Sequence, residues 1–226
     1  MASRVPFAAA VLLTIGPWAA AAHAAPGMDV DWLWGGGFYL GLPTGEFDRA
    51  VDDGYGLAGH FTALPHGRPF GLRGEVSALV YGSRSFDSQP YGGQAGATVR
   101  TDTWFGNMLV GPELRARSGT LRPYLHALAG VGYFATSSEQ SIYYETVPVS
   151  GTTRFEDAAF AWTVGGGVEL AVGSSLAIDL GARYLANGTV DYFTQGQLGS
   201  GSGALPGPHR SEAHLFTFTV GIAFGR

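Results

Sequence analysis

Large apolar residues alternate with small or charged residues along most of the chain after Trp32. In the segment 158–172 the even positions are mostly large and apolar, and the odd positions are Ala, Thr, Gly and Glu169. The segment 176–184 repeats this division, with Asp179 and Arg183 at odd positions. Because successive side chains of a strand point to opposite faces, each segment is predicted to be a strand with one apolar face.

The same alternation recurs along the chain and predicts eight strands. The expected strands cover residues 34–42, 55–64, 70–83, 103–115, 124–133, 158–172, 176–184 and 216–224. The charged residues Glu169, Asp179 and Arg183 interrupt apolar segments only at odd positions, so they agree with the period of two.

The predicted connections alternate between short and long. The second, fourth and sixth are short, near Pro65, at 118–120 and at 172–175, whereas the others are long and polar, at 43–54, 84–99, 137–154 and 187–213. Short turns at one rim and long loops at the other are typical of a transmembrane β-barrel. We therefore expect an all-β, eight-stranded antiparallel up-and-down barrel, with short periplasmic turns, long extracellular loops and both termini at the short-turn side.

Periodicity alone does not decide which face of the barrel is outside. A soluble lipocalin-like barrel turns its apolar face inward around a ligand. Its outer surface here would be mostly Gly, Ala, Ser and Thr with few charges, which suits a soluble protein poorly. We therefore expect the apolar face to contact lipid and the small face to line a lumen barely wide enough for side chains.

Charged residues of both signs fall on the predicted inner face. Because an unpaired buried charge is costly, we expect them to pair across the lumen, with His60 and His126 nearby. We interpret them as a structural network that fills the lumen, rather than as an ion or proton path. The predicted network consists of Arg73, Glu75, Glu113, Arg115, Glu169, Asp179 and Arg183.

The composition agrees with a membrane barrel and limits the alternatives. Only 14% of the 226 residues are charged, 36 are Gly and none is Cys. Without Cys there is no disulfide framework and no thiolate metal site. The net charge is −5, whereas a nucleic-acid-binding protein usually carries a basic surface, so nucleic acid is not an expected partner.

The N-terminal 24 residues have the features of a secretory signal peptide. Arg4 precedes an Ala-rich apolar run, and a small-x-small triplet ends at Ala24. A membrane-anchor helix is the alternative, but Pro6 and Pro17 interrupt the run. We expect a signal peptide at 1–24, a short lead at 25–33 and the barrel at 34–226, with Sec-type export to a bacterial outer membrane.

Seven motifs along the chain carry a resemblance to a known family. The motifs are GLPTGEF, GLRGEVSALVYGS, TWFGNMLVG, YLHALAGVGY, WTVGGGVELAV, LAIDLGARYLA and FTFTVGIAF. With them the sequence resembles the small outer-membrane β-barrel proteins of Gram-negative bacteria, the OmpA-like group of cell-envelope proteins. The resemblance covers the chain from about Trp32 onward, and one departure from the family is that Phe224 is followed by Gly225 and Arg226.

Some barrels of this kind are lipid A-modifying enzymes with a His and a Ser near the rim. Here only the stretch from His209 to His214 invites that comparison, with His209 and Ser211 as a base–nucleophile pair and Glu212 as the residue that orients the ring. Adjacent polar residues at a loop end also arise by chance, so we expect no catalysis, and we expect no cofactor and no metal site.

The expected function is structural anchoring and surface interaction through the exterior loops. The expected partners are outer-membrane lipid and lipopolysaccharide, the barrel-assembly machinery and an external ligand or host surface, but no nucleic acid. A lipid A-modifying enzyme on the same fold and a secreted lipocalin-like barrel are the alternatives.

Overall fold

The computed structural model describes the backbone of residues 29–45, 48, 53–88, 95–144, 147–192 and 209–225. Eight strands within these ranges form one closed barrel in the order of the chain. The strands are β1 (Val30–Thr44), β2 (Gly54–Pro65), β3 (Phe70–Ser88), β4 (Ala95–Arg115), β5 (Leu121–Tyr144), β6 (Val147–Ala171), β7 (Leu176–Tyr192) and β8 (His209–Gly225). Among the described residues, no helix has the length and apolar character needed to cross a membrane.

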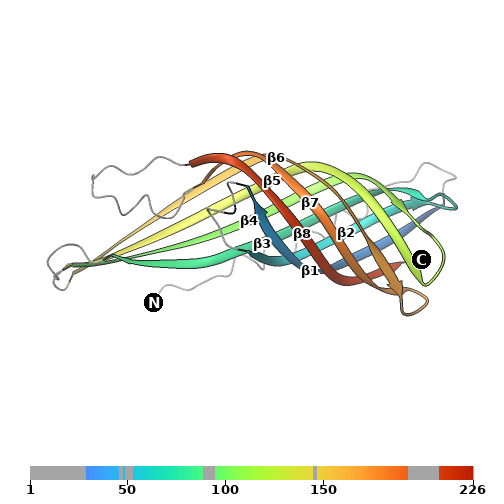
Figure 1. Cartoon of the computed structure of the whole chain (residues 1–226), viewed down its shortest axis with the longest axis horizontal. Coiled ribbons are helices and arrows are strands. Elements are labelled where there is room, and N and C mark those ends of the chain that lie inside the picture. The colour runs from blue at the N-terminus through green and yellow to red at the C-terminus, as the bar shows by residue number, and fades with distance from the viewer. Residues whose placement is uncertain are drawn as a thin grey trace.

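Each strand pairs antiparallel with its neighbours in sequence, and the first strand closes the barrel against the last. The β1–β8 ladder runs from Leu33 opposite Gly225 to Thr44 opposite His214. The strands wind steeply around the barrel, as Figure 1 shows. The predicted eight-stranded up-and-down architecture is therefore confirmed.

The barrel begins earlier than the alternation predicts. β1 starts at Val30, where Val30 already pairs with Pro65, so part of the predicted lead 25–33 belongs to the first strand. Main-chain pairing with β2 extends the strand beyond the alternating segment. The predicted signal peptide, 1–24, lies outside the described residues.

The three short connections lie together at one end, which we call the short-turn end. β2 and β3 join between Pro65 and Phe70, β4 and β5 between Arg115 and Leu121, and β6 and β7 between Ala171 and Leu176. The N-terminal end of β1 and the C-terminal end of β8 lie here too, because Val30 pairs with Pro65 and Leu33 pairs with Gly225. β1 thus begins and β8 ends at the short-turn end, where an even number of strands is expected to place them.

Two of the four predicted long loops begin later and end earlier than expected, because the strands extend into them. Most of 84–99 and 137–154 is strand, and β5 pairs with β6 without a break from Leu121 opposite Leu170 to Tyr144 opposite Val147. Residues 89–94 and 145–146, which join these strands, lie outside the described residues. Continuous main-chain pairing forms these strands although their sequence does not alternate.

β3 to β6 therefore extend past the rest of the barrel as a four-stranded sheet, which we call the ribbon. The β2–β3 ladder ends at Gly54 opposite Tyr81, and the β6–β7 ladder ends at Ala161 opposite Asn187. β3 to β6 continue beyond these points, still paired with one another. They form the long tapering end of the molecule in Figure 1.

The outward face of the barrel is a continuous apolar surface. Among the side chains that the structure describes, twenty-seven large hydrophobic ones are 36–77% exposed, and they occur on all eight strands. On β7, for example, Leu176, Ile178 and Leu180 face outward while Ala177 and Asp179 are buried. A surface of this kind suits hydrocarbon rather than water.

Candidate functional site: a lumen filled in two layers

The lumen is filled by two groups of buried side chains. The group nearer the short-turn end, the charged layer, consists of His60, Arg73, Glu75, Glu113, Arg115, Tyr124, His126, Glu169, Asp179 and Arg183. The group nearer the ribbon, the apolar layer, consists of Tyr39, Leu79, Tyr81, Phe105, Leu109, Leu128, Phe134, Ala161, Leu185, Ala213 and Leu215. All seven charged residues expected in the lumen lie in the charged layer.

Glu113 of β4 is the centre of the charged layer. It is 1% exposed, and its Oε1 accepts a hydrogen bond from Arg115 Nε at 2.7 Å. Its Oε2 accepts a bond from Arg73 Nη1 at 2.9 Å and a weaker one from Thr62 Oγ1 at 3.3 Å. One carboxylate therefore joins two arginines from neighbouring strands.

The ion pairs continue in both directions from this centre. Arg115 also pairs with Glu169 of β6, two residues before that strand ends. Arg73 also pairs with Glu75, with 3.3 Å between Arg73 Nη2 and Glu75 Oε2. A chain of alternating charges therefore crosses the barrel from β6 to β3.

The chain of charges ends at the border of the apolar layer. Glu75 pairs with Arg183 of β7 across the lumen. Arg183 Nε donates a hydrogen bond of 3.0 Å to the Tyr39 hydroxyl, and its guanidinium lies 4.6 Å from the centre of the Tyr39 ring. Tyr39 also belongs to the apolar layer, so it connects the two.

Tyr124 holds the fourth carboxylate of the layer. Its hydroxyl donates a hydrogen bond of 2.8 Å to Asp179 Oδ1, and its ring lies 5.4 Å from the Arg73 guanidinium and 4.9 Å from that of Arg115. A Cβ at Gly167 would lie 2.5 Å from the Tyr124 hydroxyl oxygen. Glycine at this position therefore makes room for the tyrosine.

Two histidines, His60 and His126, complete the charged layer. Among the described residues, neither His60 Nε2 nor either ring nitrogen of His126 has a hydrogen-bond partner. Both rings line one small cavity together with Arg73, Asp179 and Arg183. Polar atoms in such a cavity suit bound water.

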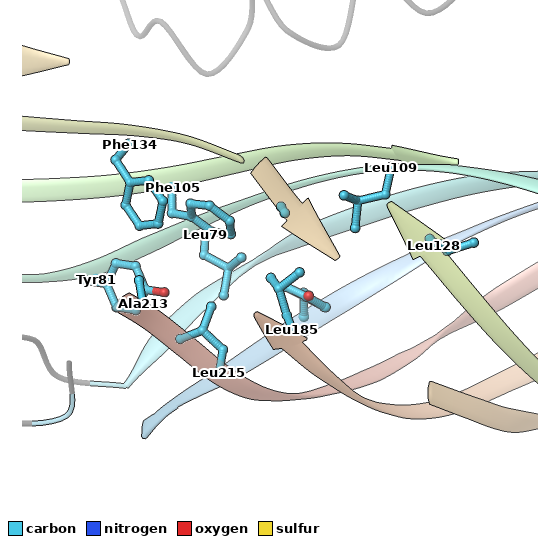
Figure 2. Close-up of a cluster of buried hydrophobic side chains, with 11 residues drawn as sticks. Leu79, Tyr81, Phe105, Leu109, Leu128, Phe134, Leu185, Ala213 and Leu215 are labelled. Carbon is cyan, nitrogen blue, oxygen red and sulfur yellow. The ribbon is translucent and has the colours of Figure 1, made fainter. Parts of the chain in front are cut away.

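The apolar layer was not predicted from the sequence, which indicated a lumen of small and charged residues. Figure 2 shows its side chains converging inside the barrel from several strands. Phe105 and Phe134, on neighbouring strands, have ring centres 4.5 Å apart, and Leu79 is opposite Phe105 in the β3–β4 ladder. These side chains are at most 3% exposed.

The candidate catalytic residues lie at the start of β8. The backbone of His209 and Ser211 pairs with Tyr192 and Val190 of β7, but their side chains are outside the described set. Glu212 is exposed, and its Oε2 lies 3.0 Å from His214 Nε2. Glu212 thus contacts His214, and the expected contact with His209 lies outside the described side chains. Among the described residues, no group of three or more His, Asp or Glu side chains could hold a metal ion.

The closed eight-stranded barrel was compared with known proteins and solved structures. The sequence matches no protein-family model and no curated protein. The crystal structure of Ail, the attachment invasion locus protein of Yersinia pestis, is similar with a TM-score of 0.51, and the match covers 88% of this chain and all of Ail at 12% identity. The chain has the fold of a small outer-membrane β-barrel.

Two further outer-membrane barrels are similar at lower scores. Neisserial surface protein A has a TM-score of 0.39 and 12% identity, with 87% of this chain and 98% of that chain covered. The outer membrane protease OmpT of Escherichia coli has a TM-score of 0.41 and 11% identity, with 88% and 96% covered. At 12% identity, the similarity to Ail concerns the fold alone.

Proposed function

We propose that this protein is an integral protein of a bacterial outer membrane, with a structural and surface-interaction role rather than an enzymatic one. The observation that carries the proposal is the apolar outward face, which is exposed on every strand. In this arrangement the apolar face contacts outer-membrane lipid and lipopolysaccharide. Export by a Sec-type route and insertion by the barrel-assembly machinery belong to the same proposal.

The lengths of the strands support this arrangement. A tilted strand needs about ten residues to cross the hydrocarbon of a bilayer. β2 has 12 residues, whereas β5 has 24 and β6 has 25. The excess length of the ribbon strands would therefore extend into water beyond one membrane surface.

In the proposed orientation, the short-turn end faces the periplasm and the ribbon faces the exterior. Short turns at the periplasmic rim are the general arrangement of outer-membrane barrels. The ribbon then carries the surface-interaction role, because it is the largest described part of the chain beyond the barrel wall.

Membrane insertion is tested by fractionation and by gel mobility. We expect the protein in the outer-membrane fraction, soluble only with detergent, and running at different positions before and after boiling. Recovery in the soluble periplasm without detergent, at a single gel position, would contradict the proposal and favour the lipocalin-like alternative.

The facing assignment is tested by two substitutions on β7. Leu180→Arg places a charge on the lipid side and should cost about 2–4 kcal/mol of unfolding free energy in a bilayer. Ala177→Ser, on the lumen side of the same strand, should cost little. Urea titrations of both variants in phospholipid vesicles measure the two unfolding free energies. Equal losses of unfolding free energy would contradict the facing assignment.

Orientation is tested with an epitope in each rim. An epitope inserted between Tyr144 and Val147, at the tip of the ribbon, should be stained on intact cells. The same epitope between Gly173 and Ser174, in a short turn, should be stained only after permeabilisation. The opposite pattern would place the ribbon in the periplasm.

The surface-interaction role is tested by shortening the ribbon. Residues 138–153 can be replaced by Asn-Gly, a dipeptide that favours two-residue hairpin turns, because Ser137 and Arg154 already pair. The variant should still insert but should lose the binding to external components that the full chain shows in a binding screen. Unchanged binding would show that residues 138–153 of the ribbon do not carry the surface-interaction role.

Catalysis is tested separately from binding. The lipid A profile should be the same in cells with and without the protein. A difference abolished by His209→Ala would instead favour the enzyme.

A further inference from the structure

We propose that the apolar layer, and not the charged layer, is the seal that closes the lumen to protons and small ions. This inference rests on the membrane insertion proposed above. It assigns the permeability barrier to side chains that are distinct from the buried ion pairs.

The apolar layer draws side chains from all around the barrel wall. Its eleven members come from every strand except β2, and β2 adds the partly buried Ala58, which packs against them. Each of the eight strands therefore contributes an apolar side chain to the described lumen.

Individual side chains of the layer reach far across the lumen. A Cβ at Gly41 of β1 would lie 2.5 Å from Leu79 Cδ2, although Leu79 is on β3 and β2 lies between them. A Cβ at Gly54 would lie 2.8 Å from the ring of Tyr81. Small residues on β1 and β2 thus make room for the large side chains of β3.

The charged layer has a different character, because it offers a continuous polar route. Its ion pairs lead from Glu169, which lines a pocket at the short-turn end, to Arg183 and then to the Tyr39 hydroxyl. Along this route several buried polar atoms have no hydrogen-bond partner among the described residues: His60 Nε2, Arg73 Nε, His126 Nδ1 and His126 Nε2. Water bound to these atoms would let protons enter the layer.

The polar route stops at the apolar layer. Beyond Tyr39 the described lumen is lined mainly by Leu79, Phe105, Leu185 and their apolar neighbours. The polar side chains buried at this level, Tyr81, Asn107 and Asn187, are neutral, so no charged group continues the chain of ion pairs. Hydrophobic constrictions of this kind exclude water and so block permeation. The barrier therefore depends on apolar packing, and breaking an ion pair leaves it in place.

The test is proton flux into vesicles that hold a pH-sensitive dye and the full-length mature protein. Leu79→Ala combined with Phe105→Ala should raise the flux about tenfold or more above wild type, because the constriction widens and wets. Val80→Ala combined with Met108→Ala changes the same two strands on the outward face and should leave the flux at the wild-type level. Glu75→Gln combined with Arg183→Gln breaks an ion pair and should leave the flux within about twofold of wild type.

Two results would overturn the proposal: a flux that rises with the Glu75 and Arg183 changes but not with the Leu79 and Phe105 changes, or a wild-type flux that equals that of the apolar-layer variant. Flotation with the vesicles and the gel shift on boiling establish insertion of each variant. If the wild type fails to insert, the proposed function fails; if all insert and the flux pattern differs, only the seal is wrong. Where the variant with both Leu79→Ala and Phe105→Ala does not fold, the single variants Leu79→Ala and Leu215→Ala replace it in the same comparison of proton flux with wild type.

Discussion

The charged layer and the apolar layer fill the same lumen by different means. Both face inward from the same strands, as Glu75 and Leu79 of β3 illustrate. In the charged layer, stability depends on partners, because each buried ion needs an opposite charge. In the apolar layer it depends on filled volume, because a truncated side chain leaves a cavity. The two halves of one lumen should therefore respond differently to substitution.

The largest effect is expected at the centre of the charged layer. Glu113→Ala removes the carboxylate that joins Arg73 and Arg115 and should cost about 3–5 kcal/mol, the range for breaking a buried ion pair. Urea titrations in phospholipid vesicles measure this loss. As a control, Glu113→Gln keeps the shape and an acceptor oxygen and should cost less; a loss as large as that of Ala would show that charge pairing is the whole effect.

A somewhat smaller effect is expected in the apolar layer. Leu215→Ala removes a side chain with 0% exposure and should cost about 3 kcal/mol through lost burial and the cavity left behind. The matched control is Phe218→Ala on the outward face of β8, where lipid fills the space. A cost at Leu215 no greater than at Phe218 would show that the layer is loosely packed.

The smallest effect tests a single hydrogen bond of the charged layer. Tyr124→Phe removes the donor to Asp179 and should cost about 2 kcal/mol, since a buried carboxylate loses a partner. Tyr55→Phe changes an exposed tyrosine on β2 and should be neutral in the same titration. If both changes are neutral, Asp179 does not depend on Tyr124.

The sequence predicted the charged layer well and the apolar layer not at all, for one physical reason. Charged residues contrast with their apolar neighbours, so Glu169 and Asp179 stand out at period two. Where both faces are apolar, as at Leu79 beside Val80 or Phe105 beside Trp104, the alternation disappears. Loss of alternation within a predicted strand is the signal that could have revealed the apolar layer.

The ribbon was missed for a related reason. The segments 84–99 and 137–154 show no sustained alternation of apolar and polar residues in the sequence. Their strands are defined by pairing with one another, and the β4–β5 and β5–β6 ladders simply continue from the barrel. Hydrophobic periodicity reports burial, so it ends where the barrel ends although the strands do not.

The most direct test of the account is a cysteine scan along β7, which the absence of native cysteine makes possible. Spin labels at positions 176–182 of the protein in vesicles report their accessibility to oxygen, which concentrates in hydrocarbon. We expect maxima at Leu176, Ile178, Leu180 and Ala182, with minima at the positions between them. Maxima at the odd positions, or no alternation, would contradict a barrel whose apolar face meets lipid and whose charges lie inside.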